Sequence, residues 1–405
     1  MERQVVIVGA GHAAGQAVVS LRQHGFTGRI VLIGDEPYLP YQRPPLSKKF
    51  LAGEMPAERL YVKPATFYAD HDVDVRRDTR VVSIDREQHT VTTQDGDAID
   101  WDELVLATGS RVRRLPDHEN APGGIHYLRT IGDVLALRGD LGAGRRVVII
   151  GAGYIGLEVA AVARNMASEV TVVEMADRVM SRVVAPDVSV FYASEHRRHG
   201  VELRFGSGLA GFEGDERVRG VFTTAGDVLP ADTVVVGVGI EPVTELAQEA
   251  GLAVDDGIVV DARCRTADTH IYAIGDCTAH PSALYGRRLR LESVHNALEQ
   301  AKTAALAICG EPADYDQVPW FWSDQYDLKL QIAGLSQGHD RVVLRGDPDT
   351  RSFSCLYLAE SRLLAIDCIN APRDFVQAKA LIERRCAPDA TRVMDTSVAL
   401  KDCVD

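Results

Sequence analysis

Short apolar runs recur along the chain and alternate with helix-like stretches. The runs are continuous rather than alternating, which is typical of strands buried on both faces of a parallel sheet. Six of them are predicted to be strands, at residues 5–8, 30–33, 104–107, 147–150, 170–173 and 234–237. Strands and helices in alternation predict a doubly wound α/β architecture.

The pattern changes after Gly310. Beyond "PWFWSDQY", the alternating runs "KLQIAGL", "RVVLRG" and "FSCLYL" predict an antiparallel sheet backed by a C-terminal helix, which would be a smaller α+β domain. Two earlier strands, in "LVLATGS" and "TVVVGVGIEP", end in glycine, and each is predicted to lead into a crossing between domains. The predicted domains are residues 1–112 with 239–318, residues 113–238, and residues 319–405.

Length and charge narrow the class of protein. The 405 residues exceed the roughly 250–300 at which a single core stops growing, which agrees with several domains. The formal net charge of −14 disfavours nucleic acid or an anionic membrane as a partner, because either needs a basic surface. The N-terminus leads directly into a strand, and the longest apolar run is too short to span a bilayer. We expect a cytoplasmic protein, a monomer or weak homodimer, that binds neither membrane nor nucleic acid.

The seven cysteines all lie in the C-terminal third of the chain, and no two form a C-x-x-C pair. Their odd number and wide spacing predict reduced thiols rather than disulfides or an iron–sulfur ligand set. No metal site is expected.

A glycine-rich turn follows the first predicted strand, in "VVIVGAGHAAGQAV". Gly9 permits the tight turn, Gly11 lets the backbone approach a pyrophosphate, and Ala14 is small enough for the helix to pack on the strand. Asp35 and Glu36 supply the acid that should close the second strand and bind a ribose. Such turns also occur for packing alone, but strand, turn and acid together predict a dinucleotide site.

The same unit returns in "VVIIGAGYIGLEVA", with Gly151, Gly153 and Gly156. Glu174 closes the next strand, where a carboxylate accepts bonds from both ribose hydroxyls and repels a 2′-phosphate, so NADH is favoured over NADPH. Arg178 lies four residues on and would weaken that preference; alternatively, Glu174 is only a solvated strand end. Two dinucleotide sites in one chain indicate an electron relay rather than a simple dehydrogenase.

The stretch "TADTHIYAIGDC" indicates which site holds a flavin. Gly275 allows close backbone approach, and the short carboxylate of Asp276 can accept a hydrogen bond from a polyol such as the ribityl chain of FAD. A cap on the next helix is the alternative role for Asp276. Its pairing with an N-terminal fingerprint favours FAD at the first site and NADH at the second.

The order of "GAGHAAG", "ATG", "GAGYIGLE", "GVGIEP" and "YAIGDC" resembles the two-nucleotide flavoprotein disulfide-reductase superfamily, with its glutathione-reductase-like fold. Within it, "YQRPPLSK", "YLRT", "ESVHNALEQA" and "PWFWSDQY" are similar to the NADH:ferredoxin reductases that serve bacterial oxygenase systems. The resemblance covers essentially the whole chain. It implies one FAD, NADH as electron donor and a two-iron two-sulfur ferredoxin as acceptor.

The resemblance assigns Asp35 to the FAD ribose, and Arg43 and Lys48 to the pyrophosphate and flavin neighbourhood. The alternative for "RPPLSK" is an ordinary proline turn with solvated charges. With the fingerprint residues, the predicted FAD contacts are Gly9, Gly11, Ala13, Ala14, Asp35, Arg43, Lys48, Val81, Ala107, Arg129, Asp276, Val294 and Trp322. The predicted NAD contacts are Gly151, Gly153, Ile155, Gly156, Glu158, Glu174, Gly239 and Ile240. Lys48 and Glu158 are the predicted catalytic residues.

Glu158 is predicted to lie on the first turn of the second nucleotide helix, where the first fingerprint has Gln16. The resemblance implies that Glu158 lies near the nicotinamide carboxamide, and interaction with the helix dipole is the alternative. Trp320 and Trp322 would share one face of a strand, as core aromatics often do. The resemblance implies instead that Trp322 covers the flavin ring.

No cysteine precedes Cys264, whereas flavoprotein disulfide reductases need a redox-active pair early in the chain. Electrons are therefore expected to leave FAD without a thiol, either by outward one-electron transfer or to oxygen. The resemblance implies the first route, with single electrons passing to the ferredoxin, which supplies a haem-thiolate monooxygenase or a ring-hydroxylating dioxygenase. Docking of an acidic ferredoxin would need a basic rim, although such charges are more often simply solvated. The candidates are Arg287, Arg288, Arg290, Lys302 and Arg345. The alternatives are an NADH oxidase or monodehydroascorbate-type reductase without ferredoxin, and a redox-switched binding protein.

Overall fold

The computed structural model describes residues 3–116, 119, 121–311 and 313–404. Within these residues, no helix is long and apolar enough to cross a membrane. The chain forms two compact units, each assembled from three stretches of sequence. The first contains Met1–Arg43, Ala57–Arg111 and Ile240–Pro319, and the second contains Pro44–Pro56, Val112–Gly239 and Trp320–Asp405.

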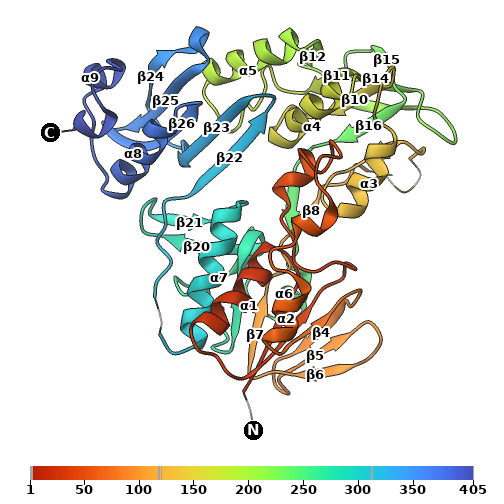
Figure 1. Cartoon of the computed structure of the whole chain (residues 1–405), viewed down its shortest axis with the longest axis vertical. Coiled ribbons are helices and arrows are strands. Elements are labelled where there is room, and N and C mark those ends of the chain that lie inside the picture. The colour runs from red at the N-terminus through yellow and green to blue at the C-terminus, as the bar shows by residue number, and fades with distance from the viewer. Residues whose placement is uncertain (1–2, 117–118, 120, 312, 405) are drawn as a thin grey trace. The chain divides into compact units, whose positions relative to one another are not determined.

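The first unit is built on a five-stranded parallel sheet in the order β19-β7-β1-β2-β3. Its strands are β1 (Gln4–Val8), β2 (Arg29–Ile33), β3 (Val73–Arg76), β7 (Glu103–Leu106) and β19 (Ile271–Ala273). Three of them confirm predicted strands, and their continuous apolar runs are buried because both faces of the sheet are covered. On one face, α1 (His12–Gln23) packs beside α7 (Val294–Ile308), as Figure 1 shows.

An antiparallel sheet covers the other face of the main sheet, where Val81, Val91 and Ile99 join Val6 and Val31 in one apolar cluster. Its strands are β4 (Val81–Asp85), β5 (Thr90–Thr93) and β6 (Ala98–Asp100). The smaller elements of the unit are α2 (Ala65–Asp70), α6 (Glu245–Glu249), η2 (Ala57–Leu60), η4 (Gly275–Cys277), β18 (Ile258–Val259), β20 (Thr278–Ser282) and β21 (Arg287–Leu289). Where the chain passes between the units, β8 (Ser110–Val112) pairs with β17 (Ile240–Pro242).

The second unit repeats the plan of the first. Its parallel sheet has the order β12-β11-β10-β16-β9, so the fingerprint strand β10 is flanked by β11 and β16 as β1 is flanked by β2 and β7. This confirms the predicted duplication. The elements are β9 (Ile125–His126), β10 (Arg146–Ile150), β11 (Glu169–Glu174), β12 (Val201–Phe205), β16 (Thr233–Val236), α3 (Ile131–Gly139), α4 (Tyr154–Asn165), α5 (Pro186–Arg198), η1 (Pro44–Ser47) and the antiparallel β13 (Leu209–Glu213), β14 (Gly220–Thr223) and β15 (Val228–Pro230).

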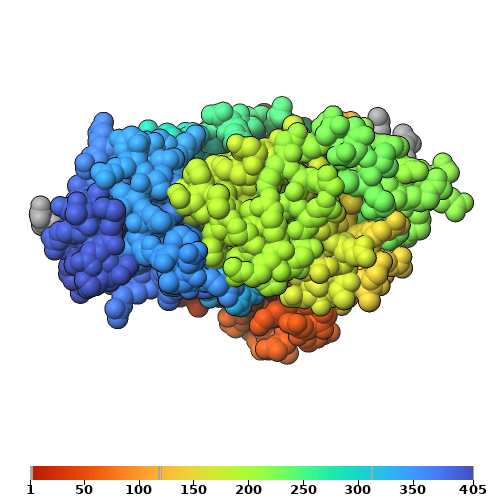
Figure 2. Space-filling view, turned by 90° about the horizontal axis from the view of Figure 1, so that it is seen from above, coloured from red at the N-terminus to blue at the C-terminus, as the bar shows by residue number. Residues whose placement is uncertain are grey.

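The predicted antiparallel sheet after Gly310 is confirmed, in the order β22-β23-β26-β25-β24, and α8 (Pro372–Glu383) packs on β23 and β26. Its other elements are β22 (Trp320–Gln325), β23 (Leu328–Gly334), β24 (Arg341–Asp347), β25 (Ser352–Ala359), β26 (Arg362–Ile369), α9 (Ala390–Met394), η5 (Pro348–Thr350) and η6 (Leu400–Asp402). In Figure 2 this region, in blue, lies directly against the yellow-green part of the same unit. The division into three domains stays a proposal.

A buried carboxyl joins this C-terminal sheet to the start of α5. Asp367 on β26 is only 1% exposed and accepts a hydrogen bond from the hydroxyl of Tyr357 on β25. The Tyr357 oxygen in turn accepts from the backbone N–H of Ala185, at 2.6 Å. Burial raises the pKa of Asp367 to about 7, although the Tyr357 hydrogen bond opposes this.

The free energy of unfolding of the second unit should therefore fall as the pH rises from about 4 to about 7. An unfolded aspartate has a pKa of about 4, so between about pH 4 and 7 only the folded state keeps this proton. The free energy of unfolding should decrease over that window by at most about 4 kcal/mol. Asp367→Asn removes the titration, so the difference in Tm between variant and parent should change with pH in calorimetry. A difference that is constant from pH 5 to 8 would contradict this, and Tyr357→Phe serves as a control that keeps the carboxyl.

Candidate functional site

The first fingerprint forms an open turn at the start of α1. Gly9 has φ +106°, and a Cβ atom there would stand 2.2 Å from the carbonyl oxygen of Ala107. Gly11 is the N-cap of α1 and no side chain caps it, whereas a Cβ at Gly11 would meet no atom within 4 Å. The first turn of α1 holds no acidic residue that would repel an anion. The helix N–H groups next to the open space at Gly11 therefore suit an anion. Ala13 and Ala14 are buried on the inner side of the helix.

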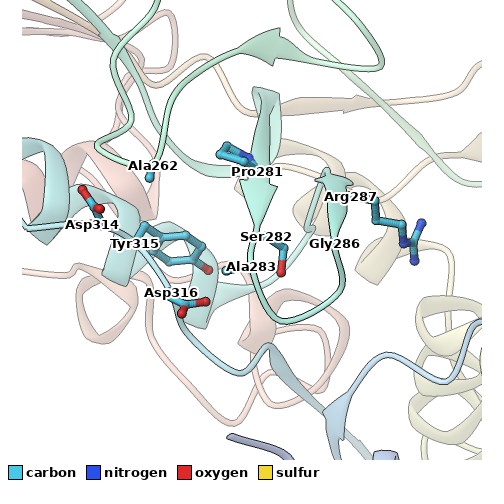
Figure 3. Close-up of a pocket in the computed structure, with 9 residues that line it drawn as sticks. All are labelled: Ala262, Pro281, Ser282, Ala283, Gly286, Arg287, Asp314, Tyr315 and Asp316. Atoms are coloured by element: carbon cyan, nitrogen blue, oxygen red, sulfur yellow. The ribbon is translucent and has the colours of Figure 1, made fainter. Parts of the chain in front are cut away.

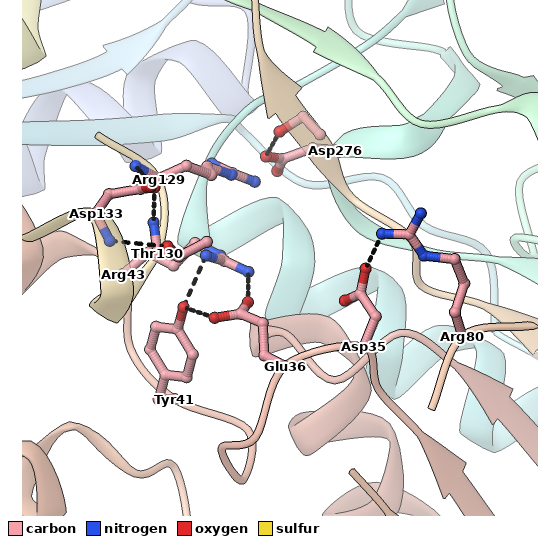
Figure 4. A network of polar contacts seen from close by, with 10 residues as sticks. Asp35, Glu36, Tyr41, Arg43, Arg80, Arg129, Thr130, Asp133 and Asp276 are labelled. Carbon is pink, nitrogen blue, oxygen red and sulfur yellow. Dashed lines mark hydrogen bonds and ion pairs between the residues drawn. The ribbon is translucent and has the colours of Figure 1, made fainter. Parts of the chain in front are cut away.

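The two acids after β2 have different surroundings. Asp35 is exposed and lies 3.3 Å from Arg80 at its nearest oxygen. Glu36 instead accepts from the guanidinium of Arg43 at 3.0 Å and from the hydroxyl of Tyr41 at 2.6 Å, as Figure 4 shows. Glu36 therefore holds Arg43 in place, while Asp35 keeps the solvent-facing position that a ribose ligand needs.

Asp276 lies in η4, beside the first turn of α1. Gly275 has φ +82°, and a Cβ atom there would stand 3.2 Å from the Cβ of Ala13. The hydroxyl of Ser110 donates to Oδ2 of Asp276 at 2.7 Å, a contact drawn in Figure 4. The first unit thus brings Asp276 close to the open fingerprint turn, and Ser110 is a partner that sequence reasoning missed.

The remaining predicted FAD contacts are distributed over both units. Ala107 follows β7, Val81 is buried at the start of β4, and Val294 begins α7 directly after its N-cap Ser293. Lys48, Arg129 and Trp322 belong to the second unit, and their contact with FAD stays a prediction.

The second fingerprint has the same open geometry. Gly151 has φ +102° and a Cβ there would stand 2.4 Å from the carbonyl oxygen of Gly237, while Gly153, the N-cap of α4, has no atom within 4 Å of such a position. At Gly156 a Cβ would stand 2.1 Å from the carbonyl oxygen of Gly151. The first fingerprint carries Ala14 at this point, so α4 lies closer to its turn than α1 does.

Glu174 is held at the end of β11. Its Oε2 accepts from the N–H of Ala152 at 2.7 Å and its Oε1 from the N–H of Ala176 at 2.9 Å, which places the carboxylate beside the fingerprint turn. Arg178 donates instead to the carbonyls of Ser181 and Val184 and to the hydroxyl of Ser189. The guanidinium is thus engaged in holding the following loop, which disfavours the idea that it weakens the preference for NADH.

Of the other predicted NAD contacts, Ile155 and Gly239 belong to the second unit and Ile240 to the first. Ile155 is 43% exposed on the first turn of α4. Gly239 has φ +109°, and a Cβ atom there would meet no atom within 4 Å, while Ile240 begins β17.

Glu158 is a buried carboxylate with three donors. Lys48 lies 2.7 Å from its Oε2, which the hydroxyl of Ser47 also contacts, and Ser323 donates to its Oε1 at 2.6 Å. Burial raises the pKa of Glu158, and Lys48 together with the two hydroxyls counteracts this. The residue is the fifth of α4, so its predicted place on the first turn is wrong and a helix-dipole role loses its support.

Sequence reasoning missed Ser47 and Ser323, although signals for both were present. Ser47 precedes Lys48 in "RPPLSK". The alternation that groups Trp320 with Trp322 also puts Ser323 on the opposite face of β22.

The segment that carries Lys48 is attached to α3. Arg138 donates to the carbonyls of Phe50 and Leu51, and its guanidinium lies 4.8 Å from the centre of the Phe50 ring. Lys48 and Glu158 are thereby held within one compact unit.

The two tryptophans share one face of β22, as predicted, with ring centres 5.4 Å apart. Trp320 also meets Phe375 of α8 edge-on at 5.7 Å, which is a packing role. The role of Trp322 at the flavin stays a prediction.

The predicted basic rim receives little support. The side chain of Arg345 is only 5% exposed and binds Asp374 and three backbone carbonyls, so its assignment as a docking cation is wrong. Arg290 pairs with two acids, Lys302 pairs with Glu299, and Arg288 donates to two carbonyls. These charges are mostly engaged within the first unit.

Arg287 lines a hollow of about 390 Å³ in the first unit. Figure 3 shows Tyr315, Asp314 and Asp316 on one side and Arg287 on the other, with its guanidinium directed away from the tyrosine. The lining contains none of the predicted nucleotide contacts.

Comparisons with known proteins agree with this arrangement. The family model of the pyridine nucleotide-disulphide oxidoreductases matches residues 3–301, and the reductase C-terminal model matches residues 320–404. Rhodocoxin reductase from Rhodococcus erythropolis is 45% identical over 399 residues, which are 98% of this chain and 93% of that protein. The 5,5'-dehydrodivanillate O-demethylase ferredoxin reductase subunit from Sphingobium sp. is 44% identical over 400 residues, 98% of this chain and 97% of that protein.

A solved structure is similar over the whole chain. The covalent putidaredoxin reductase–putidaredoxin complex matches with a TM-score of 0.96 at 44% identity, covering 99% of this chain and 98% of that one. The chain therefore belongs to the pyridine nucleotide-disulphide oxidoreductase family, among the FAD-dependent ferredoxin reductases of oxygenase systems.

Proposed function

We propose that this chain carries electrons from NADH through FAD, one at a time, to a two-iron two-sulfur ferredoxin that supplies an oxygenase. We also propose that it works in the cytoplasm as a monomer or weak homodimer. The observation that carries the first proposal is the pair of open fingerprint turns, one in each unit, each followed by a strand that leads to a carboxylate. Relatives of this chain are themselves reductases for ferredoxins.

The residues of the first unit fit FAD. Gly11 has no Cβ atom, which leaves open space beside the uncapped start of α1, and the pyrophosphate would bind there. Asp35 would bind the ribose, Arg43 would contribute positive charge, and Asp276 would accept from the ribityl chain. Bound there, FAD would take a hydride from NADH and give up the two electrons singly, which a nicotinamide alone does not do.

The residues of the second unit fit NADH. Gly153 leaves the same open space at the start of α4, and Glu174 stands fixed beside it by two backbone N–H groups. We infer that Glu174 binds the adenosine ribose and excludes a 2′-phosphate by charge repulsion.

Lys48 and Glu158 would act together. Lys48 compensates the negative charge of a carboxylate that burial would otherwise tend to protonate. We infer that Glu158 binds the nicotinamide carboxamide and so orients the ring for hydride transfer.

Electron transfer to a ferredoxin is the direct test of the function. The purified protein is reduced with NADH in the absence of oxygen and mixed with a two-iron two-sulfur ferredoxin, while the iron–sulfur absorbance is followed. We expect the ferredoxin to be reduced with two molecules consumed for each NADH, because one hydride carries two electrons.

Two results would contradict the proposal. Flavin reduction without reduction of any such ferredoxin, and with rapid turnover on oxygen or a small acceptor, would indicate an oxidase or monodehydroascorbate-type reductase. DNA binding at physiological salt in a gel shift would favour a redox-switched binding protein.

Alanine at the two open glycines should separate the two cofactor sites. Gly11 and Gly153 have ordinary φ values and room for a methyl group, so Gly11→Ala and Gly153→Ala should fold normally. Each methyl fills space that a pyrophosphate needs, so Gly11→Ala should lose FAD on dialysis and Gly153→Ala should raise the KM for NADH about tenfold, a loss of roughly 1.4 kcal/mol.

Gly156→Ala is the control for this pair. Its Cβ would stand 2.1 Å from the carbonyl oxygen of Gly151, so this variant should lower the Tm, which Gly11→Ala and Gly153→Ala should not, in addition to any effect on NADH binding. The FAD-to-protein absorbance ratio, NADH titration and calorimetry measure the three effects. An unchanged KM in Gly153→Ala would remove the assignment of the second site.

Glu174→Gln should shift the nucleotide preference. The amide removes the charge that repels a 2′-phosphate and supplies one acceptor in place of two, so the ratio of kcat/KM for NADH to that for NADPH should fall by about tenfold or more. Glu202→Gln, at an exposed position on the neighbouring strand β12, should leave the ratio unchanged. Equal ratios in Glu174→Gln and the parent protein would count against the role of Glu174.

A further inference from the structure

One face of β22 contacts the second nucleotide helix, α4, and the end of the strand reaches α5 through a hydrogen bond between Gln325 and His196. Phe321, Ser323 and Gln325 alternate with the tryptophans and so point to the opposite side of the strand. The ring of Phe321 lies 4.9 Å from that of Tyr154, the first residue of α4. Ser323 and Gln325 are both fully buried and reach two polar residues of the helices, one on α4 and one on α5.

These polar residues form a continuous buried chain that ends at Glu158. The Nε2 atom of His196 on α5 lies 2.8 Å from Oε1 of Gln325. The Nε2 atom of Gln325 donates to Oγ of Ser323 at 3.1 Å, and Ser323 donates to Oε1 of Glu158 at 2.6 Å. At the far end, the hydroxyl of Tyr326 lies 3.3 Å from Nδ1 of His196.

The Gln325 amide sets the direction of every bond in the chain. Its NH2 group faces Ser323, so its oxygen faces His196 and requires Nε2 of the histidine to be the donor. Burial lowers the pKa of His196 to about 4, so the ring is neutral and its Nδ1 accepts from Tyr326. All donors therefore point toward Glu158. An amide cannot pass a proton along, so the chain orients and stabilises rather than conducts.

The other groups around Glu158 come from different elements. Lys48 and Ser47, from the segment that contains η1, contact Oε2, and Tyr192 of α5 is the further titratable group whose charge state Glu158 influences. Oε1 has Ser323 as its donor from the C-terminal sheet. The two carboxylate oxygens of Glu158 thus have donors from different segments of the chain.

We propose that Ser323, Gln325 and His196 are positioning residues for the nicotinamide site: they keep the Glu158 carboxylate ionised and in one orientation, and they make the C-terminal sheet part of the NADH-binding machinery. The inference rests on the proposed function, in which Glu158 contacts the nicotinamide. A role in stability alone would not need a carboxylate at the end of the chain, because a packed apolar contact such as Phe321 on Tyr154 stabilises a buried interface without the desolvation of a charge.

The test measures the rate at which NADH reduces the flavin of the FAD-loaded protein in rapid mixing, as a function of pH. Loss of a hydrogen bond to a charged group raises the pKa of that group, so Ser323→Ala should move the acid limb of the rate profile up by about one pH unit. At low pH the rate of flavin reduction in Ser323→Ala should therefore be several-fold lower than in the parent protein. Ser323→Thr keeps the hydroxyl and should retain the parent profile, and Gln325→Met should give a smaller shift in the same direction.

Ser354→Ala is the matched control. Ser354 is a fully buried serine of the same sheet that donates to a carboxylate, Asp374, at 3.1 Å, so its loss should lower the Tm without moving the profile. The inference would be overturned if the parent protein reduces its flavin with NADH but the pH profile is unchanged in both Ser323→Ala and Gln325→Met. Absence of flavin reduction by NADH in the parent would instead overturn the proposed function. Should Ser323→Ala fail to fold, the Gln325→Met and Ser323→Thr profiles decide.

Discussion

The carboxylate of Glu158 is the group on which the arrangement of the second unit depends. A charge buried to 1% exposure is stable only when donors surround it, and here the donors come from two stretches that are both far from Glu158 in sequence. Lys48 and Ser47 lie in the segment Pro44–Pro56, and Ser323 lies more than 150 residues beyond Glu158. The need of one buried carboxylate for hydrogen-bond donors therefore specifies how the segment Pro44–Pro56, the helix α4 and the C-terminal sheet pack together.

The C-terminal sheet meets α4 and α5 through polar groups as well as through aromatic contacts such as Phe321 on Tyr154. Gln325, His196 and Ser323 satisfy one another in series, and Glu195 on α5 binds Arg351 at 3.1 Å close by. Asp367 adds a second buried carboxyl, joined to the loop before α5 through Tyr357. Directional bonds of this kind select one packing arrangement, whereas apolar side chains tolerate several.

The two fingerprints illustrate how one folding plan is adapted to two ligands. Both turns leave open space at the helix N-cap, at Gly11 and at Gly153, which is the geometry that a pyrophosphate requires. They differ in how closely the helix approaches its turn, through Ala14 and Gly156, and in the partners of the acidic residues that close the second strand of each unit. Glu36 is committed to Arg43 and leaves Asp35 exposed, whereas Glu174 is bound by the backbone of its own turn.

The sequence by itself determined the features whose physical cause is local. Continuous apolar runs predicted the buried strands, glycine spacing predicted both turns, and alternation placed Trp320 and Trp322 on one face of β22. Only the tertiary structure decided which charges meet. Arg345 looked like a surface cation but is buried against Asp374, and Arg178 is engaged with the loop that follows Glu174. Ser47 and Ser323 converge on Glu158 because long-range packing, which residue spacing does not encode, brings their elements together.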